Sequence, residues 1–128
     1  MSTAVLLIAH GSRRAVANDD LKRLAQTIRD DTPADVDAVE IGFLELTTPT
    51  IPDGFEACVR AGATHVRIVP YFLSMGVHMK EDLTELCEQF GQSHPQVSIE
   101  VLPPLGLHPK VVDVIRDRCA GGEPATVG

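Results

Sequence analysis

Histidine is the residue type in this sequence that is best suited to bind a metal or to move a proton near neutral pH. The chain has five, which are His10, His65, His78, His94 and His108. Two neutral imidazoles in one site can ligate a borderline divalent metal such as Co²⁺ or Fe²⁺ and can also accept protons. A lone histidine is more often a structural residue, so the positions of the five in the fold decide which are candidates for chemistry.

The elements that must position these side chains alternate between strand and helix patterns. Strands are predicted at 4–9, at 39–43 with the stretch ending near Glu45, at 64–70 and at 97–102. Helices are predicted between 21 and 32, between 50 and 62 with Thr50 and Asp53 as a capping pair, between 83 and a stop at Gly91, and from 108 onward. We therefore expect one α/β domain over residues 1–120, with parallel strands, helices on both faces of the sheet and a flexible tail over 121–128.

In open parallel sheets, ligands bind outside the carboxyl ends of the strands. His10 follows the first predicted strand, and His78 and His108 close the loops after the third and fourth. His65 and His94 stand where predicted strands begin, at the opposite end. His10 is the strongest candidate because an apolar strand runs straight into it, whereas His108 also suits the start of a helix.

Basic residues are predicted to gather at the same end as His10. They are Arg13, Arg14, Lys80 and Lys110. Together with helix amino termini they predict a locally basic rim that favours carboxylates or phosphates, although paired arginines also suit a solvated turn. Gly11 is expected to let a ligand approach the backbone closely.

Two further features each allow two interpretations. Glu45 follows the second strand, where it either orients an imidazole or receives a proton, or serves as an ordinary loop residue that caps a backbone amide. The connection 71–77 is unusually apolar, so it either packs under the last helix or offers a hydrophobic wall to a flat ligand.

Composition and charge argue against several classes of protein. A net charge of -7 disfavours binding to nucleic acids or anionic membranes. The apolar run at 4–9 is far too short to span a bilayer and no basic leader precedes it, so we expect a cytoplasmic protein. Cys58, Cys87 and Cys119 form no CxxC pair, and each is expected to be a small buried hydrophobe on a helix.

Four segments carry a resemblance to a known family. They are Leu7-Ile8-Ala9-His10-Gly11-Ser12-Arg13, Gly42-Phe43-Leu44-Glu45 with Pro49, Val69-Pro70-Tyr71-Phe72-Leu73 through Gly76-Val77-His78, and Leu105-Gly106-Leu107-His108-Pro109. In this order and spacing they resemble the short, single-domain sirohydrochlorin chelatases, a family of chelatase-like cobaltochelatases and ferrochelatases. The resemblance covers residues 4 to about 119.

The resemblance implies ATP-independent insertion of a divalent metal, Co²⁺ or Fe²⁺, into sirohydrochlorin in cobalamin or siroheme biosynthesis. It implies that His10 and His78 are the metal-binding and catalytic residues, that the metal (Co²⁺, Fe²⁺ or Ni²⁺) is a substrate, and that no organic cofactor is used. It also implies a three-layer α/β/α fold with a four-stranded parallel sheet in the order 2-1-3-4. Candidate contacts to sirohydrochlorin are Ser12, Arg13, Arg14, Glu45, Lys80 and His108.

A homodimer is expected, because one such layer offers a single wall to a macrocycle and two-fold symmetry is the commonest way to supply a second. Two other functions are considered. A histidine phosphatase also has a strand that ends in His-Gly, but that family places arginine before the histidine, where this chain has Ala9. A non-catalytic carrier of a metal or a tetrapyrrole would keep the same fold without turnover.

Overall fold

The fold consists of four strands and four helices that alternate along the chain. A computed structural model describes residues 2–122 and 124. The elements are β1 (Thr3–Ala9), α1 (Ala15–Asp30), β2 (Ala38–Phe43), α2 (Ile51–Arg60), β3 (His65–Pro70), α3 (Val77–Ser93), β4 (Ser98–Val101) and α4 (Pro109–Cys119). All pairings are parallel and the sheet order is β2-β1-β3-β4, which confirms the predicted fold class and strand order.

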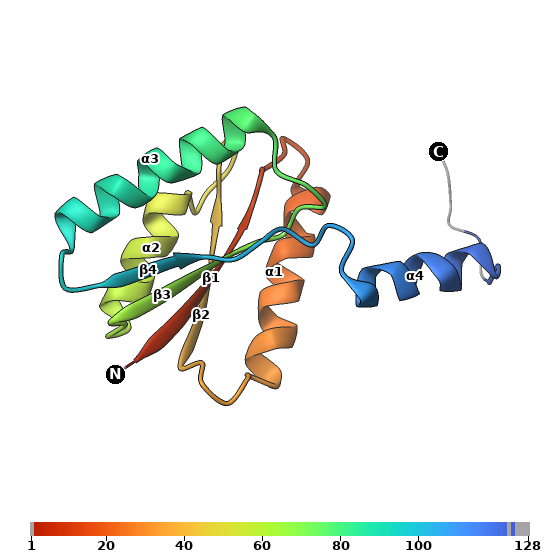
Figure 1. The fold of residues 1–128 in the computed structure, drawn as a ribbon, viewed down its shortest axis with the longest axis horizontal. Helices are drawn as coiled ribbons and strands as arrows, with labels where there is room; N and C mark the ends of the chain where they lie inside the picture. The colour runs from red at the N-terminus through yellow and green to blue at the C-terminus, as the bar shows by residue number, and fades with distance from the viewer. Residues whose placement is uncertain (1, 123, 125–128) are drawn as a thin grey trace.

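Three helices cover the sheet in two layers, with α1 on one face and α2 and α3 on the other (Figure 1). The central strand β1 is buried on both faces because its side chains alternate between two cores. Leu7 packs with Leu21 of α1, whereas Leu6 packs in the core that contains Phe55 of α2 and Phe90 of α3. Both cores hold the strand ends in fixed positions, and the loops that follow them carry the candidate site.

Helix α3 is longer than the sequence pattern predicts. It begins at Val77 and continues through Gly91, so the predicted stop at Gly91 is wrong. A glycine inside a helix costs about 1 kcal/mol relative to alanine. The next turn is held by the backbone N–H of His94, which donates to the Phe90 carbonyl at 2.8 Å, while the Phe90 side chain is buried in the core.

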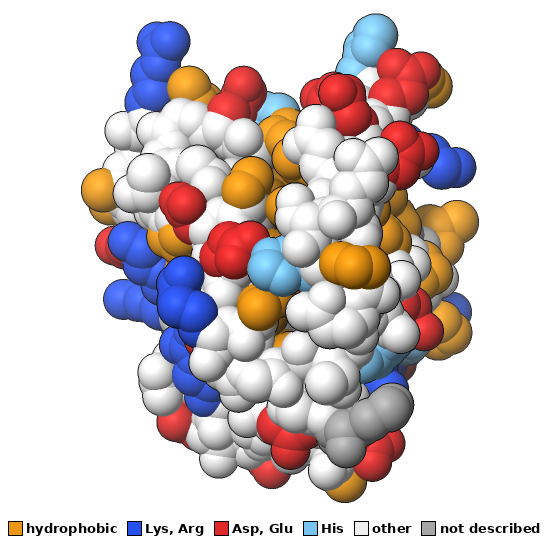
Figure 2. All heavy atoms as spheres, turned by 90° about the vertical axis from the view of Figure 1, so that its left-hand side faces the viewer, with side chains coloured by type: hydrophobic (Ala, Val, Ile, Leu, Met, Phe, Trp, Pro, Cys, Tyr) orange, Lys and Arg blue, Asp and Glu red, His pale blue; other side chains and the backbone are white. Residues whose placement is uncertain are grey.

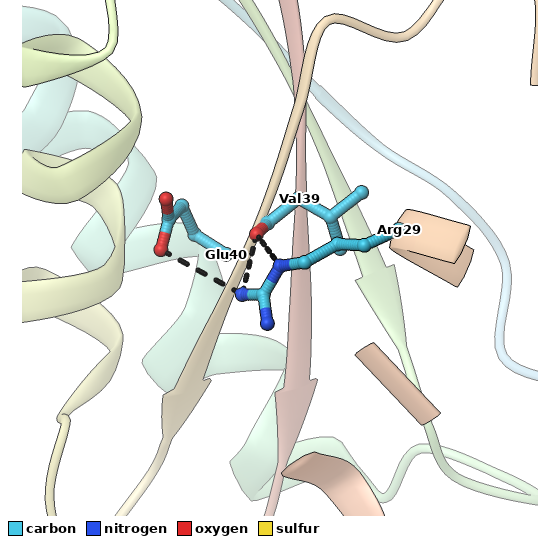
Figure 3. Close-up of polar contacts among 3 residues, drawn as sticks. All are labelled: Arg29, Val39 and Glu40. Carbon is cyan, nitrogen blue, oxygen red and sulfur yellow. Dashed lines mark hydrogen bonds and ion pairs between the residues drawn. The ribbon is translucent and has the colours of Figure 1, made fainter. Parts of the chain in front are cut away.

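The edge strand β2 is capped by a side chain from α1. Arg29 donates from Nε and Nη2 to the carbonyl oxygen of Val39, at 3.0 and 2.7 Å, and its Nη2 lies 4.0 Å from Glu40 Oε2 (Figure 3). An occupied edge carbonyl is no longer free to pair with another strand. At the opposite edge, β4 is short, and all its side chains except Ile99 are exposed.

Helix α4 is the main departure from the expected layers. It projects from the body of the protein (Figure 1), and none of its residues is buried. The apolar connection 71–77 therefore does not pack under the last helix. Cys119, on α4, is exposed, which corrects the expectation that all three cysteines are buried; Cys58 is buried and Cys87 half-buried.

Within the described residues, no helix is both long enough and apolar enough to cross a bilayer. The flexible tail predicted for 121–128 falls largely on residues 123 and 125–128, which lie outside the described part of the chain.

Candidate metal site at the carboxyl ends of the strands

The site begins where β1 and β2 end side by side. Their parallel pairing continues past the strands, because the backbone N–H of Glu45 donates to the His10 carbonyl at 3.0 Å. Gly11 has a φ of 101°, and a Cβ there would lie 1.9 Å from the Glu45 carbonyl oxygen. Glycine is therefore needed at this position because the loop passes against the backbone of Glu45.

This close approach brings the side chains of His10 and Glu45 together. The Nε2 of His10 lies 2.9 Å from Oε1 of Glu45, and the two side chains are 57% and 54% exposed. A carboxylate that accepts the Nε2–H fixes the imidazole tautomer and leaves Nδ1 free to bind a metal or accept a proton. Of the two interpretations of Glu45, the geometry favours the partner that orients an imidazole.

His78 reaches the same place from α3. It is the second residue of that helix, which follows the apolar connection 71–77 and begins after Gly76. A hollow of about 390 Å³ separates these elements, and its lining includes His10, His78, Glu45, Asp82, Leu44, Phe72 and Met79. In Figure 2 the end of the molecule where β1 and β2 finish is at the top, and histidine and acidic side chains stand on both sides of an indentation there. Two imidazoles and two carboxylates thus face one solvent-open hollow.

The sequence reasoning missed Asp82, although a signal was present. Asp82 follows His78 by four residues, so one turn of α3 places both on the same face of the helix. A carboxylate at that spacing adds an oxygen ligand, or a hydrogen-bond acceptor, to the wall that carries His78. Within residues 2–122 and 124, no three or more His, Cys, Asp or Glu side chains form a ready metal-binding group.

Asn18 is a second residue that the sequence reasoning missed. It is the buried polar residue of α1, and its side chain accepts from the Ser12 N–H at 2.9 Å and donates to the Ser12 carbonyl at 2.7 Å. The side-chain amide of Asn18 therefore forms hydrogen bonds with both the backbone N–H and the backbone carbonyl of Ser12. The loop that carries His10 is fixed to α1 in this way.

The other predicted substrate contacts do not gather around this hollow. Arg13 and Arg14 are exposed at the start of α1, and Lys80 lines a different cavity between α3 and β4. His108 caps α4, where its Nδ1 accepts from the Lys110 N–H at 3.1 Å. Among the described residues, no lysine or arginine lines this hollow, and its charged residues are Glu45 and Asp82, because α3 turns Asp82, and not Lys80, toward it.

Comparisons with known proteins agree on one family. The CbiX family model matches residues 4–121. A sirohydrochlorin ferrochelatase from Priestia megaterium is 36% identical over 90% of this chain and 42% of its own length. A sirohydrochlorin cobaltochelatase from Methanococcus aeolicus is 31% identical over 92% of this chain and 98% of its own length.

Solved structures give the same result. SirB from Bacillus subtilis with Fe³⁺ superposes with a TM-score of 0.84 and 35% identity, over 96% of this chain and 49% of that one. A sirohydrochlorin chelatase SirB from Bacillus subtilis subspecies spizizenii, in complex with cobalt, superposes with a TM-score of 0.83 and 36% identity, over 94% and 50%. The chain spans less than half the length of the first curated relatives it matches. The chain belongs to the CbiX family.

Proposed function

We propose that this chain catalyses ATP-independent insertion of a divalent metal, Co²⁺ or Fe²⁺, into sirohydrochlorin. The observation that carries the proposal is the pairing of His10 with Glu45 across a hollow that His78 also lines. Relatives named as sirohydrochlorin ferrochelatases and cobaltochelatases support the choice of substrate. Iron as substrate would place the chain in siroheme synthesis, and cobalt would place it in cobalamin synthesis.

Metal insertion has two requirements that these side chains meet. The ion must exchange water for protein ligands, and two pyrrole N–H protons of the macrocycle must leave. Nδ1 of His10 is free for either task, because Nε2 is engaged by Glu45, and the negative carboxylate stabilises the imidazolium that forms when a proton is accepted. His78 supplies a second nitrogen from the opposite wall of the hollow.

The walls of the hollow suit a flat macrocycle. Leu44, Phe72 and Met79 provide apolar surface beside the histidines. The peripheral carboxylates of sirohydrochlorin need cations, and the predicted contacts Ser12, Arg13, Arg14, Lys80 and His108 remain part of the proposal. A homodimer in the cytoplasm completes it, because this layer presents one wall and a second copy would supply the other.

The test is an anaerobic absorbance assay. The purified chain is mixed with sirohydrochlorin, alone and with Co²⁺, Fe²⁺ or Ni²⁺, and the spectrum is followed over time. We expect the metallated product to form faster than in the spontaneous reaction. A shift on binding sirohydrochlorin without accelerated metallation would identify a carrier and contradict the proposed enzyme.

A further inference from the structure

Helix α1 buries a polar side chain at a position where an apolar one would pack. Asn18 is 6% exposed, and it shares the buried face of α1 with Leu21 and Ala25, which follow it at intervals of three and seven. Asparagine is a weak helix former, and a buried amide is costly unless its polar atoms are hydrogen-bonded. The stability of α1 alone would favour an apolar residue here. Contacts outside the helix must therefore account for the amide.

The side-chain amide of Asn18 pairs with Ser12 as a neighbouring strand would. Its Oδ1 accepts the Ser12 N–H at 2.9 Å, and its Nδ2 donates to the Ser12 carbonyl at 2.7 Å. In a sheet, a strand bonds to its neighbour through the same two backbone groups. β1 ends at Ala9, and its pairing with the segment after β2 continues as far as the His10 carbonyl, which accepts the Glu45 N–H at 3.0 Å. Asn18 thus holds the chain two residues beyond this backbone pair.

The residue between the two anchored positions, Gly11, has little conformational preference of its own. Its φ is 101°, a conformation that places the loop against the carbonyl oxygen of Glu45. Glycine populates positive and negative φ about as readily, so the residue does not by itself hold the loop in this conformation. The hydrogen bonds of His10 on one side and of Ser12 on the other must do so. Loss of the bonds to Ser12 would remove the restraint on the carboxyl side of His10.

The ring of His10 depends on this restraint more than the ring of His78 does. The His10 side chain is 57% exposed, so its position follows from the backbone and from the contact between Nε2 and Glu45 Oε1 rather than from packing. His78 stands in the first turn of α3, a helix of 17 residues that Leu83 and Phe90 anchor in the core. A metal held by both rings needs them at a fixed separation. The loop side of the hollow is the side that is more easily displaced.

We propose that Asn18 is a positioning residue for metal insertion. Its amide holds Ser12, and Gly11 transmits this restraint. Nδ1 of His10 is thereby kept at a fixed place in the hollow that it shares with His78. The inference rests on the proposed function, because it assigns a role in the same reaction. A displacement of about 1 Å in a reacting group can reduce a rate by about 100-fold, so a buried residue outside the hollow can still control the rate.

The first test needs no metallation. Asn18→Leu keeps a side chain of similar size and removes both bonds to Ser12, and ¹⁵N relaxation reports the mobility of the Gly11 and Ser12 amides. We expect order parameters of about 0.85 in the wild type and below about 0.6 in the variant. Titration with Co²⁺ alone, followed by absorbance, should show an affinity lower by about 10-fold, because a ligand of the metal is no longer held in place.

The second test is the steady-state rate of insertion of Co²⁺ into sirohydrochlorin at saturating Co²⁺. We expect kcat of Asn18→Leu to fall by about 10- to 100-fold, with KM for sirohydrochlorin within about twofold of the wild type, because the apolar walls of the hollow are unchanged. Asn18→Asp keeps the acceptor for the Ser12 N–H and loses the donor to the Ser12 carbonyl, so it should change the same quantities in the same direction. It decides the question if Asn18→Leu fails to fold.

Ala25→Gly is the matched control. It weakens α1 on the same buried face, two turns away from Asn18, and it leaves the bonds to Ser12 in place. Folded Ala25→Gly should keep the order parameters, the Co²⁺ affinity and the kcat of the wild type. Asn18 variants with rigid amides at Gly11 and Ser12 and with wild-type Co²⁺ affinity, or losses that Ala25→Gly shows equally, would overturn the positioning role. An inactive wild type would overturn the proposed function instead, while relaxation and Co²⁺ binding would still decide the role of Asn18.

Discussion

Two histidine–glutamate pairs with the same geometry stand at opposite ends of this sheet. In both, Nε2 of the histidine lies 2.9 Å from Oε1 of the glutamate: His10 with Glu45 at the carboxyl end, and His94 with Glu56 at the amino end. The side chain of His10 is 57% exposed beside an open hollow, while that of His94 is 21% exposed and its ring lies against Phe55. The same pair of side chains is therefore open to a ligand in one place and joins two helices in the other.

The largest expected effect is on the rate of metal insertion, and it should arise at the carboxyl end of the sheet. Replacing His10 or His78 by alanine should reduce the rate of metal insertion by about 10²- to 10⁴-fold, because a base or a ligand is lost. Both side chains are exposed, so the thermal midpoint should stay near that of the wild type. Initial rates by absorbance, paired with thermal melts, check this. Equal rates for wild type and both variants would remove the histidines from the mechanism.

A smaller effect is expected from the partner of His10. Glu45→Gln keeps the size of the side chain but removes the negative charge that stabilises a protonated imidazole. The loss in rate or in metal affinity should be about 10- to 100-fold. Glu56→Gln is the matched control in the other pair, and it should leave metallation unchanged. If both variants lose activity alike, the difference between the two pairs is not functional.

At the amino end, replacing the histidine should lower the stability of the fold and leave metal insertion unchanged. His94→Ala removes the bond to Glu56 and the contact with Phe55, so it should destabilise the fold by roughly 1 kcal/mol, since Glu56 is half exposed and the bond is screened. Urea denaturation measures this loss. Metallation by the folded variant should match the wild type, and His65→Ala should change neither quantity. A His94→Ala variant that is as stable as the wild type but inactive would contradict the assignment of a structural role to the amino end and of the chemistry to the carboxyl end.

The smallest expected effect is on the pH dependence of stability. It arises outside both histidine–glutamate pairs, at the amino terminus of α2. The pKa of Asp53 is lowered because its carboxylate accepts the backbone N–H of Thr50, with a further contribution from the Thr50 hydroxyl. A lowered pKa adds stability above the ordinary value of 3.8, and this stability is lost as the pH falls through the folded-state pKa. Thermal melts of wild type and Asp53→Asn should therefore converge in acid. If the difference in thermal midpoint between wild type and Asp53→Asn persists unchanged at low pH, it does not come from the lowered pKa of Asp53.

Much of the fold follows from local patterns in the sequence. The run at 4–9 predicts a central strand because it is apolar on both faces, and the capping pair of Thr50 and Asp53 is confirmed as a reciprocal capping box. The neighbouring positions of His10 and Glu45 could also be anticipated, because each follows a strand and parallel strands end at the same edge.

The remaining features depend on distances that no local pattern encodes. A helix is predictable at α4, but its projection away from the sheet is set by the path of the segment 103–108. Lys80 and Asp82 lie two residues apart, so they point to different sides of α3, and the phase of that helix decides which one reaches the hollow. Asn18 was missed because a polar residue in a helix reads as a surface position.

The proposed reaction requires that metal is delivered at the hollow shared by His10 and His78. The most direct measurement is an NMR titration of the histidine ring signals with paramagnetic Co²⁺ in the absence of sirohydrochlorin, with each signal assigned from single alanine variants. We predict that the signals of His10 and His78 broaden or shift at the lowest metal concentrations, while those of His65 and His94 stay unchanged. Early changes at His65, His94 or His108, with His10 and His78 unaffected, would contradict the account.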